Sequence, residues 1–440
     1  MTREVSSPPH ALAAARPPPL KRHVAAVVVG NALEFYDFLT YAFFAVYIGQ
    51  TFFPSANPTS SLLLSLATFG AGFVTRPIGG IVIGSLGDRI GRKPAMFLSF
   101  SLMGVAIVGV ACTPAYAAIG MAAPLLVLFF RLLQGFALGG EVGPTTAFLI
   151  ESPPPETRGF YGTLQSASQY AATFTAGVVG TGLATILDPA ALARWGWRAA
   201  FLIGALIIPF GLIVRRSLPE TMHGVDDAAL APDATAGRLS MPALWRKHLG
   251  VAVLGLLMLA SATISTYVIL FLPTHALHDL HMPPQATFAA TLVIGLCGVF
   301  SGPVGGALSD RIGRRPVMIG STLLMIAVTI PAFLVLDRFR SGPVLLGIAA
   351  GLTILFAAGG AVTIMTVSES LPQKIRSGAT ATIYALAIAI FGGSAQFNVL
   401  WLSDRLGDPV APAYYMTAAL VVGLIAMILI PESAPVRQKR

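Results

Sequence analysis

The sequence is poor in charged residues and in cysteine. Only 11% of its 440 residues are Asp, Glu, Lys or Arg, whereas 55% are hydrophobic, and this balance excludes an ordinary soluble domain. The two cysteines, Cys112 and Cys297, lie in or beside apolar runs, so we expect neither a disulfide framework nor a metal cluster. The phosphate-loop pattern Gly-X-X-X-X-Gly-Lys-Ser/Thr does not occur, so we expect no direct use of ATP.

Long apolar runs are abundant instead. Many are long enough to cross about 30 Å of hydrocarbon as a helix, and runs of this length exclude a barrel of short alternating strands. We therefore predict an all-α membrane protein with twelve transmembrane helices. The predicted spans are 23–50, 60–86, 94–113, 118–150, 160–187, 197–215, 248–273, 286–308, 316–336, 342–368, 378–402 and 411–430.

A dense motif of charge and turn residues occurs twice, as Gly87–Pro94 and as Ser309–Pro316. The two copies lie about half the chain apart, and such spacing indicates two related halves. We expect the chain to divide into a disordered tail 1–22, a six-helix bundle 23–216, a linker 217–247, a six-helix bundle 248–431 and a tail 432–440.

The placement of Lys and Arg predicts the orientation. If both termini are cytoplasmic, the cytoplasmic side carries 21 of these residues and the opposite side carries five. Because positive charge accumulates on the cytoplasmic side of membrane proteins, we expect both termini to lie there. Residues 1–22 are basic and rich in Pro and Ala, so we expect no cleaved signal peptide.

The repeated motif resembles the loop signature of the major facilitator superfamily, Gly-X-X-X-Asp-Arg-X-Gly-Arg-Arg/Lys, at Gly84–Lys93 and Gly306–Arg315. Four further segments look like the metabolite:proton symporter branch: Gly30–Phe38, Arg76–Gly80, Arg131–Gly135 and Trp195–Arg198. Within that branch, three segments look most like citrate–proton symporters: Gly159–Tyr161, Gln165–Gln169 and Phe391–Gly393. The resemblance implies two pseudo-symmetric six-helix bundles, a monomeric secondary transporter in a bacterial inner membrane, and no enzymatic activity.

Charged residues inside predicted spans need a reason, because burying an ionised group in a membrane is costly. Glu34 and Asp37 lie three residues apart in the first span, and Glu141 lies in the fourth. Each is a candidate for carrying a proton, with Asp37 preferred as the deeper of the first two. The alternative is that a carboxylate neutralises an arginine across the bundle, or, for Glu141, a structural role.

Arg76 and Arg131 are the candidates for an anionic substrate, because a guanidinium grips a carboxylate with two parallel hydrogen bonds. The alternative for each is an ion pair between helices. The second half has no fully intramembrane charge, so we expect it to shape the pocket. Polar residues at helical spacing complete the predicted substrate site: Asn31, Tyr41, Gln134, Gln165, Gln169, Tyr267, Tyr384 and Asn398.

The repeated motifs form a predicted cytoplasmic gate together with a second pair of residues, Glu151 and Arg158, which recurs as Glu369 and Arg376. By resemblance to the superfamily, such a network holds the cytoplasmic ends together when the site faces outward. The alternative is that these charges only determine topology. The predicted gate residues are Asp88, Arg89, Arg92, Glu151, Arg158, Asp310, Arg311, Arg314, Glu369 and Arg376, with Asp88–Arg158 and Asp310–Arg376 as plausible pairs.

These features together predict a proton-coupled symporter that imports a di- or tricarboxylate such as citrate by alternating access. The expected partners are a small organic anion, protons and the lipid bilayer, with no nucleic acid, cofactor, metal or catalytic residue. One alternative is symport of a zwitterion such as proline or betaine. Another, from a different class, is a metabolite receptor without transport; the two retained motifs and the short linker disfavour it.

Overall fold

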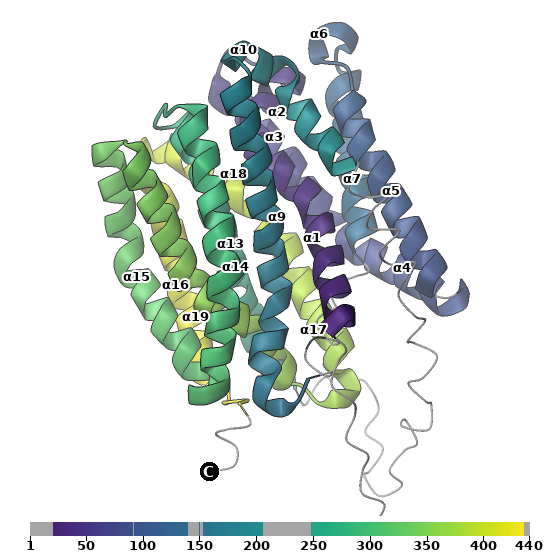
Figure 1. Ribbon diagram of the computed structural model, residues 1–440, viewed down its shortest axis with the longest axis vertical. Helices are drawn as coiled ribbons and strands as arrows, with labels where there is room; N and C mark the ends of the chain where they lie inside the picture. Colours follow the sequence, from purple (N-terminus) through teal and green to yellow (C-terminus); the bar gives the residue numbers. More distant parts are fainter. Residues whose placement is uncertain (1–20, 91, 140–148, 150–152, 206–247, 435–440) are drawn as a thin grey trace, which may run out of the picture.

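The computed structural model describes residues 21–90, 92–139, 149, 153–205 and 248–434. Within these residues every regular element is a helix (Figure 1). Most of the predicted tails and the whole linker 217–247 lie outside the described residues. The first half contains α1 (Lys21–Phe43), α2 (Ala45–Phe52), α3 (Pro58–Val74), α4 (Arg76–Ile90), α5 (Arg92–Cys112), α6 (Tyr116–Ile119), α7 (Ala122–Leu138), η1 (Pro155–Thr157), α9 (Arg158–Ile186), α10 (Pro189–Ala191) and the π-helical turn η2 (Leu192–Gly196), which continues as helix over 197–205.

The second half is described as far as residue 434. It contains α13 (Leu249–His278), α14 (Pro284–Ile312), α15 (Arg314–Phe339), α16 (Gly342–Glu369), α17 (Gln373–Ala387), the π-helical turn η4 (Ile388–Gly392), α18 (Gly393–Leu406) and α19 (Ala411–Leu429). Seven stretches of the described helices are long and apolar enough to cross a membrane on their own. The described helices cover part of each of the twelve predicted spans, so the predicted all-α class is confirmed.

The second predicted span is broken where α3 ends and α4 begins. Pro77 follows Arg76 at this point, and a proline has no backbone N–H and clashes with the carbonyl four residues earlier, so the helix is interrupted. The Thr75 hydroxyl donates to the carbonyl oxygen of Gly72, at 3.3 Å, and to that of Leu132 in α7, at 2.7 Å. The break therefore positions Arg76 at the start of a new helix, inside the bundle.

The two halves meet along α9 and α14, which lie side by side in Figure 1. Glycines allow this approach, because a Cβ built on Gly177 would lie 2.4 Å from the backbone of Leu292 and one on Gly295 would lie 2.2 Å from that of Phe174. A second contact between the halves joins α3 to α18, where a Cβ on Gly70 would lie 2.1 Å from the carbonyl oxygen of Gly393. Small residues at these contacts let the helix backbones pack closely.

The molecule has two ends across the predicted membrane. We call the one where α4 and α14 finish and α9 begins the motif end; it is the lower end in Figure 1. At the other end, α13 extends beyond the predicted limit at residue 273 and finishes at His278. His275 and His278 therefore lie in the last turn of α13, beyond the predicted end of this span. Asp279 closes that turn, with a ring nitrogen of each imidazole 2.6 Å from its carboxylate.

Gly135 tests the close packing of α7 against α3. A Cβ at this position would lie 1.6 Å from the Gly72 carbonyl oxygen, so we expect Gly135→Ala to destabilise the protein by more than about 2 kcal/mol through overpacking. Thermal unfolding of the purified protein in detergent measures the effect. Gly182→Ala in α9 is the matched control, since no atom lies within 4 Å of its Cβ; equal melting temperatures for the two variants would contradict the packing.

Candidate functional site

Arg131 of α7 is fully buried inside the first bundle, in an enclosure of aromatic rings. Its guanidinium carbon lies 4.8 Å from the ring centroid of Phe38, 4.4 Å from that of Tyr41 and 5.1 Å from that of Phe69. The guanidinium also donates hydrogen bonds to the side-chain oxygen of Gln134 and, at 3.5 Å, to the carbonyl oxygen of Phe69. Ring faces and these two oxygens together replace the water that a buried guanidinium has lost.

Arg76 occupies the neighbouring side of the same enclosure. It is 7% exposed, and its guanidinium carbon lies 4.6 Å from the ring centroid of Phe38 and 4.5 Å from that of Phe73. Its charge interacts electrostatically with the hydroxyl groups of Tyr267 and Tyr384, which come from the second half. Arg76 therefore acts across the boundary between the two bundles. Arg131 also interacts electrostatically with Tyr267, but its described hydrogen bonds and ring contacts stay within the first bundle.

Asp37 of α1 is 1% exposed and interacts electrostatically with Arg131. Neither oxygen of its carboxyl group has a hydrogen-bond partner among the described residues. No ion pair recorded for the described residues joins it to either arginine. A buried carboxyl group without hydrogen bonds is costly to keep ionised, so this group is suited to gain and lose a proton.

A cavity of about 110 Å³ lies between the halves. Its polar lining includes Gln165 and Gln169 from α9, Tyr267 from α13 and Tyr384 from α17, all of them predicted substrate residues. The side chains of Gln169 and Tyr384, one from each half, lie near each other in this lining. No charged residue appears in the described lining.

Tyr267 forms the partition between this cavity and the two arginines. Its ring packs edge-on against Phe73, with centroids 5.6 Å apart, and against Phe69 at 6.1 Å, while the same residue lines the cavity. The cavity and the charged enclosure are thus neighbours that share one aromatic wall. Arg76 itself is not part of the described cavity lining.

The remaining predicted substrate residues lie elsewhere. Asn31 joins α1 to α9, donating to the Ser168 hydroxyl at 2.7 Å and to the Gln165 carbonyl oxygen at 3.4 Å. Tyr41 donates to the Ser65 carbonyl oxygen at 3.4 Å. Asn398 of α18 lies 3.5 Å from the Tyr415 hydroxyl of α19 and is not part of the described cavity lining. Of the predicted proton carriers, Glu141 and the side chain of Glu34 lie outside what the structure describes.

The predicted gate is best described in the second half, where Arg314 at the start of α15 is its centre. This fully buried arginine donates to Asp310 at 2.7 Å and to both carboxylate oxygens of Glu369 at 3.2 Å. Asp310 also accepts hydrogen bonds from the backbone N–H groups of Gly159, at 2.8 Å, and Phe160, at 3.1 Å. The carboxylate therefore ties α14 to the N-terminus of α9 in the other half, where negative charge is favoured.

Other gate predictions are less fully described. Arg158 is the first residue of α9, and Arg311 is exposed. Glu151 and the side chains of Asp88, Arg89, Arg92 and Arg376 lie outside what the structure describes, so the pairs Asp88–Arg158 and Asp310–Arg376 stay predictions. What Asp310 does contact is Arg314, four residues further along the chain.

Two residues near the C-terminus, which the sequence analysis did not predict, join the Arg314–Glu369 cluster. Glu432 accepts hydrogen bonds from the backbone N–H groups of Arg314, at 2.9 Å, and Arg315, at 3.1 Å, while the Ser433 hydroxyl donates to Glu369 at 2.8 Å. A signal was available, because Ile430–Ser433 repeats the pattern of Leu218–Thr221, which follows the first bundle at the start of the linker. Each segment consists of an aliphatic residue followed by Pro, Glu and then Ser or Thr.

At the opposite end, His275 and His278 contact Asp279 and hold the end of α13 in place. Burial alone would raise the pKa of Asp279, but hydrogen bonds from His275 and His278 outweigh it and hold that pKa well below its usual range. Asp279 therefore stays ionised at any physiological pH. No cluster of metal-ligating side chains occurs among the described residues.

Comparison with known proteins gives one consistent family. The Major Facilitator Superfamily model matches residues 27–390. The chain is 37% identical to the citrate-proton symporter of Klebsiella pneumoniae over 404 residues, which cover 91% of this chain and 89% of the relative. It is 33% identical to the alpha-ketoglutarate permease of Escherichia coli, with 91% of each chain covered. It is 32% identical to the proline/betaine transporter of Salmonella typhimurium, with 94% and 84% covered.

Among solved structures, a D-xylose-proton symporter has the same fold, with a TM-score of 0.75 and 17% identity over 94% of this chain and 98% of that one. A family match over most of the sequence, relatives above 30% identity and an all-helical fold of this kind leave no role for an enzyme. The chain is a multi-pass membrane transporter and belongs to the major facilitator superfamily.

Proposed function

We propose that this chain is a proton-coupled symporter that imports a small di- or tricarboxylate such as citrate. The observation that carries the proposal is Asp37, which lies buried inside the first bundle, accepts no hydrogen bond from the described residues and interacts electrostatically with Arg131. A polar cavity between the two bundles provides the space for a substrate. Two relatives with high coverage, a citrate-proton symporter and an alpha-ketoglutarate permease, support a carboxylate substrate. Several relatives are named as symporters or permeases, which supports inward transport.

In this proposal Asp37 carries the proton. When Asp37 is ionised, its charge and that of Arg131 attract each other within the first bundle. When it is protonated, the attraction is lost and Arg131 is held by Gln134, the Phe69 carbonyl oxygen and the aromatic rings. The two protonation states thus favour different arrangements of α1 and α7, which is what coupling of a proton to a conformational change requires. Glu34 and Glu141 stay secondary candidates.

Arg76 attracts the substrate carboxylate. Its charge reaches the hydroxyl groups of Tyr267 and Tyr384, both of which line the cavity. A carboxylate entering the cavity first accepts hydrogen bonds from these hydroxyls and is then gripped by the guanidinium behind them, through two parallel hydrogen bonds. Gln165 and Gln169 complete the polar lining from α9. Charge recognition then belongs to the first half, and the second half shapes the pocket.

One observation favours a second substrate. Five aromatic residues line the cavity, namely Phe35, Tyr170, Tyr267, Phe356 and Tyr384, and no charged residue appears in the described lining. Aromatic faces of this kind attract quaternary ammonium groups. A zwitterion such as glycine betaine would direct its carboxylate toward Arg76 and its ammonium group to these rings. The similarity to a proline/betaine transporter is consistent with this alternative.

The motif-end contacts act as the gate. Asp310 bridges the halves through the backbone of α9, and the Arg314–Glu369 pair holds Asp310 in place. Opening the motif end separates Asp310 from the N–H groups of Gly159 and Phe160. We further propose that the motif end faces the cytoplasm of a bacterium, with both termini inside, that bundles 23–216 and 248–431 rock about the central site, and that the monomer is the working unit.

Uptake into proteoliposomes tests the function. We expect accumulation of citrate, tricarballylate or 2-oxoglutarate that requires an inward proton gradient, because one pH unit corresponds to about 1.4 kcal/mol, or about tenfold accumulation, per proton. Accumulation of glycine betaine or proline, with no carboxylate transported, would replace the first substrate class by the second. Transport unaffected by a protonophore would contradict the coupling in either case.

Asp37→Asn tests the proton carrier. We expect this variant to exchange substrate across the membrane at close to the wild-type rate but to lose gradient-driven accumulation, because a neutral amide cannot release a proton. Counterflow and net uptake measured on the same preparation separate the two activities. Asp404→Asn changes an exposed carboxylate in α18 and is the matched control. If Asp37→Asn still concentrates substrate, the proton is carried elsewhere.

Arg76→Lys tests the substrate contact. An ammonium group retains the charge but not the planar fork of donors, so we expect binding to weaken by about tenfold or more. Substrate-induced quenching of intrinsic fluorescence, or the concentration dependence of uptake, gives the affinity. Arg405→Lys in the exposed end of α18 controls for the chemical change. An unchanged affinity would assign Arg76 a structural role.

A further inference from the structure

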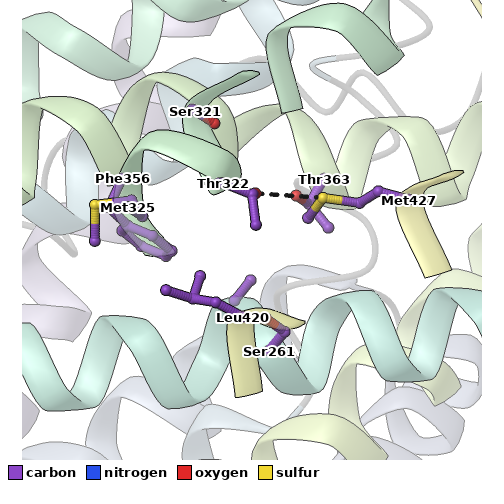
Figure 2. A pocket seen from close by; sticks show the side chains of 10 residues that line it. Ser261, Ser321, Thr322, Met325, Phe356, Thr363, Leu420 and Met427 are labelled. Carbon is purple, nitrogen blue, oxygen red and sulfur yellow. Dashed lines mark hydrogen bonds between the residues drawn. The ribbon is translucent and has the colours of Figure 1, made fainter. Parts of the chain in front are cut away.

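A second, smaller cavity lies wholly inside the second bundle, among α13, α15, α16 and α19. Its volume is about 10 Å³. Figure 2 shows Thr322, Thr363 and Met427 along one edge of this cavity, and Ser261 and Leu420 along the facing edge. The cavity is therefore bounded by both apolar and hydroxyl side chains from four different helices.

Two of these hydroxyl groups have no hydrogen-bond partner in the part of the chain that the structure describes. Ser261 is 2% exposed and Thr363 is fully buried, and neither Ser261 Oγ nor Thr363 Oγ1 has a hydrogen-bond partner among the described residues. A third hydroxyl, that of Thr322, donates to the sulfur of Met427 at 3.4 Å, and a thioether is a weak acceptor. Buried hydroxyl groups normally form hydrogen bonds, so the hydroxyls of Ser261 and Thr363 indicate that a hydrogen-bonding group is missing from this cavity.

The dimensions and the charge of the cavity determine what can fill it. Its volume corresponds to about one water-sized sphere, which is near the smallest space that holds an ordered water molecule. The described lining contains no charged side chain, so a bare cation would be buried without a counter-charge. A water molecule is small enough, is neutral, and both donates and accepts hydrogen bonds.

We propose that one water molecule occupies this cavity and bridges Ser261 of α13 to Thr363 of α16. The site adjoins the central cavity, because Ala262, Phe356 and Gly360 line both. Gly360 leaves room beside the Phe356 ring, since a Cβ there would lie 2.9 Å from that ring. The water also fixes α13, the helix that carries Thr263 and Tyr267 into the central cavity.

An experimental structure of the full chain, at a resolution that shows ordered water, tests the proposal directly. We expect one density peak within hydrogen-bonding distance of both Ser261 Oγ and Thr363 Oγ1. Well-defined side chains with no density between them would overturn the proposal, and so would an ion with short, regular coordination distances.

Thermal unfolding of Thr363→Val in detergent provides an independent test, because the sign of the shift depends on the water. If the water is bound, the valine removes one of its partners, and we expect the melting temperature to fall by about 2 °C. If the cavity is empty, the same change removes an unsatisfied hydroxyl and the melting temperature rises, which would overturn the proposal.

Thr353→Val, in the same helix, is the matched control. Thr353 is also fully buried and its hydroxyl also lacks a partner among the described residues, but it lines neither of the two cavities. We expect this variant to melt higher than the wild-type protein. A fall in both variants would count against the proposal, because loss of packing would then account for the effect without a water molecule.

Discussion

An ionised side chain inside a helical membrane bundle is stable only if the protein replaces the water that it has lost. Arg76 and Arg131 meet this constraint with aromatic ring faces, and Phe38 contacts both guanidinium groups. Asp37 meets it least well, since its oxygens accept no hydrogen bond from the described residues and its compensation is the nearby charge of Arg131. This incomplete compensation makes Asp37 sensitive to protonation, and the proposed coupling depends on it.

The packing of the two bundles determines which parts of the protein a protonation change at Asp37 can affect. Glycines such as Gly177 and Gly295 bring α9 and α14 into backbone contact, while the central cavity opens beside α9, against α13, α16 and α17. At the motif end, Asp310 joins α14 to α9 by hydrogen bonds that depend on geometry. In the proposed mechanism, α9 connects a change of charge in the first bundle to the motif end, because it carries cavity residues and the N–H groups that bind Asp310.

Much of the architecture could be predicted because its signals are strong. Apolar runs determine the helices, the repeated motif indicates the two halves, and Arg76 and Arg131 stand out as rare charges in apolar spans. The aromatic enclosure could not be predicted, since phenylalanine is ordinary filler in such helices and only tertiary packing selects Phe38.

Asn398 points to the same limit for the lining residues, because the rotation of α18 places it near Tyr415 and away from the described cavity lining. The Glu432 contact depends on where the chain returns after α19.

The most direct test of the central claim is the movement of protons when substrate is added. In lightly buffered proteoliposomes without an imposed gradient, addition of the transported substrate to the outside should make the external medium more alkaline, because each substrate molecule enters with a proton. The signal should be absent for Asp37→Asn. Substrate entry with no change in external pH in the wild-type protein would contradict the account.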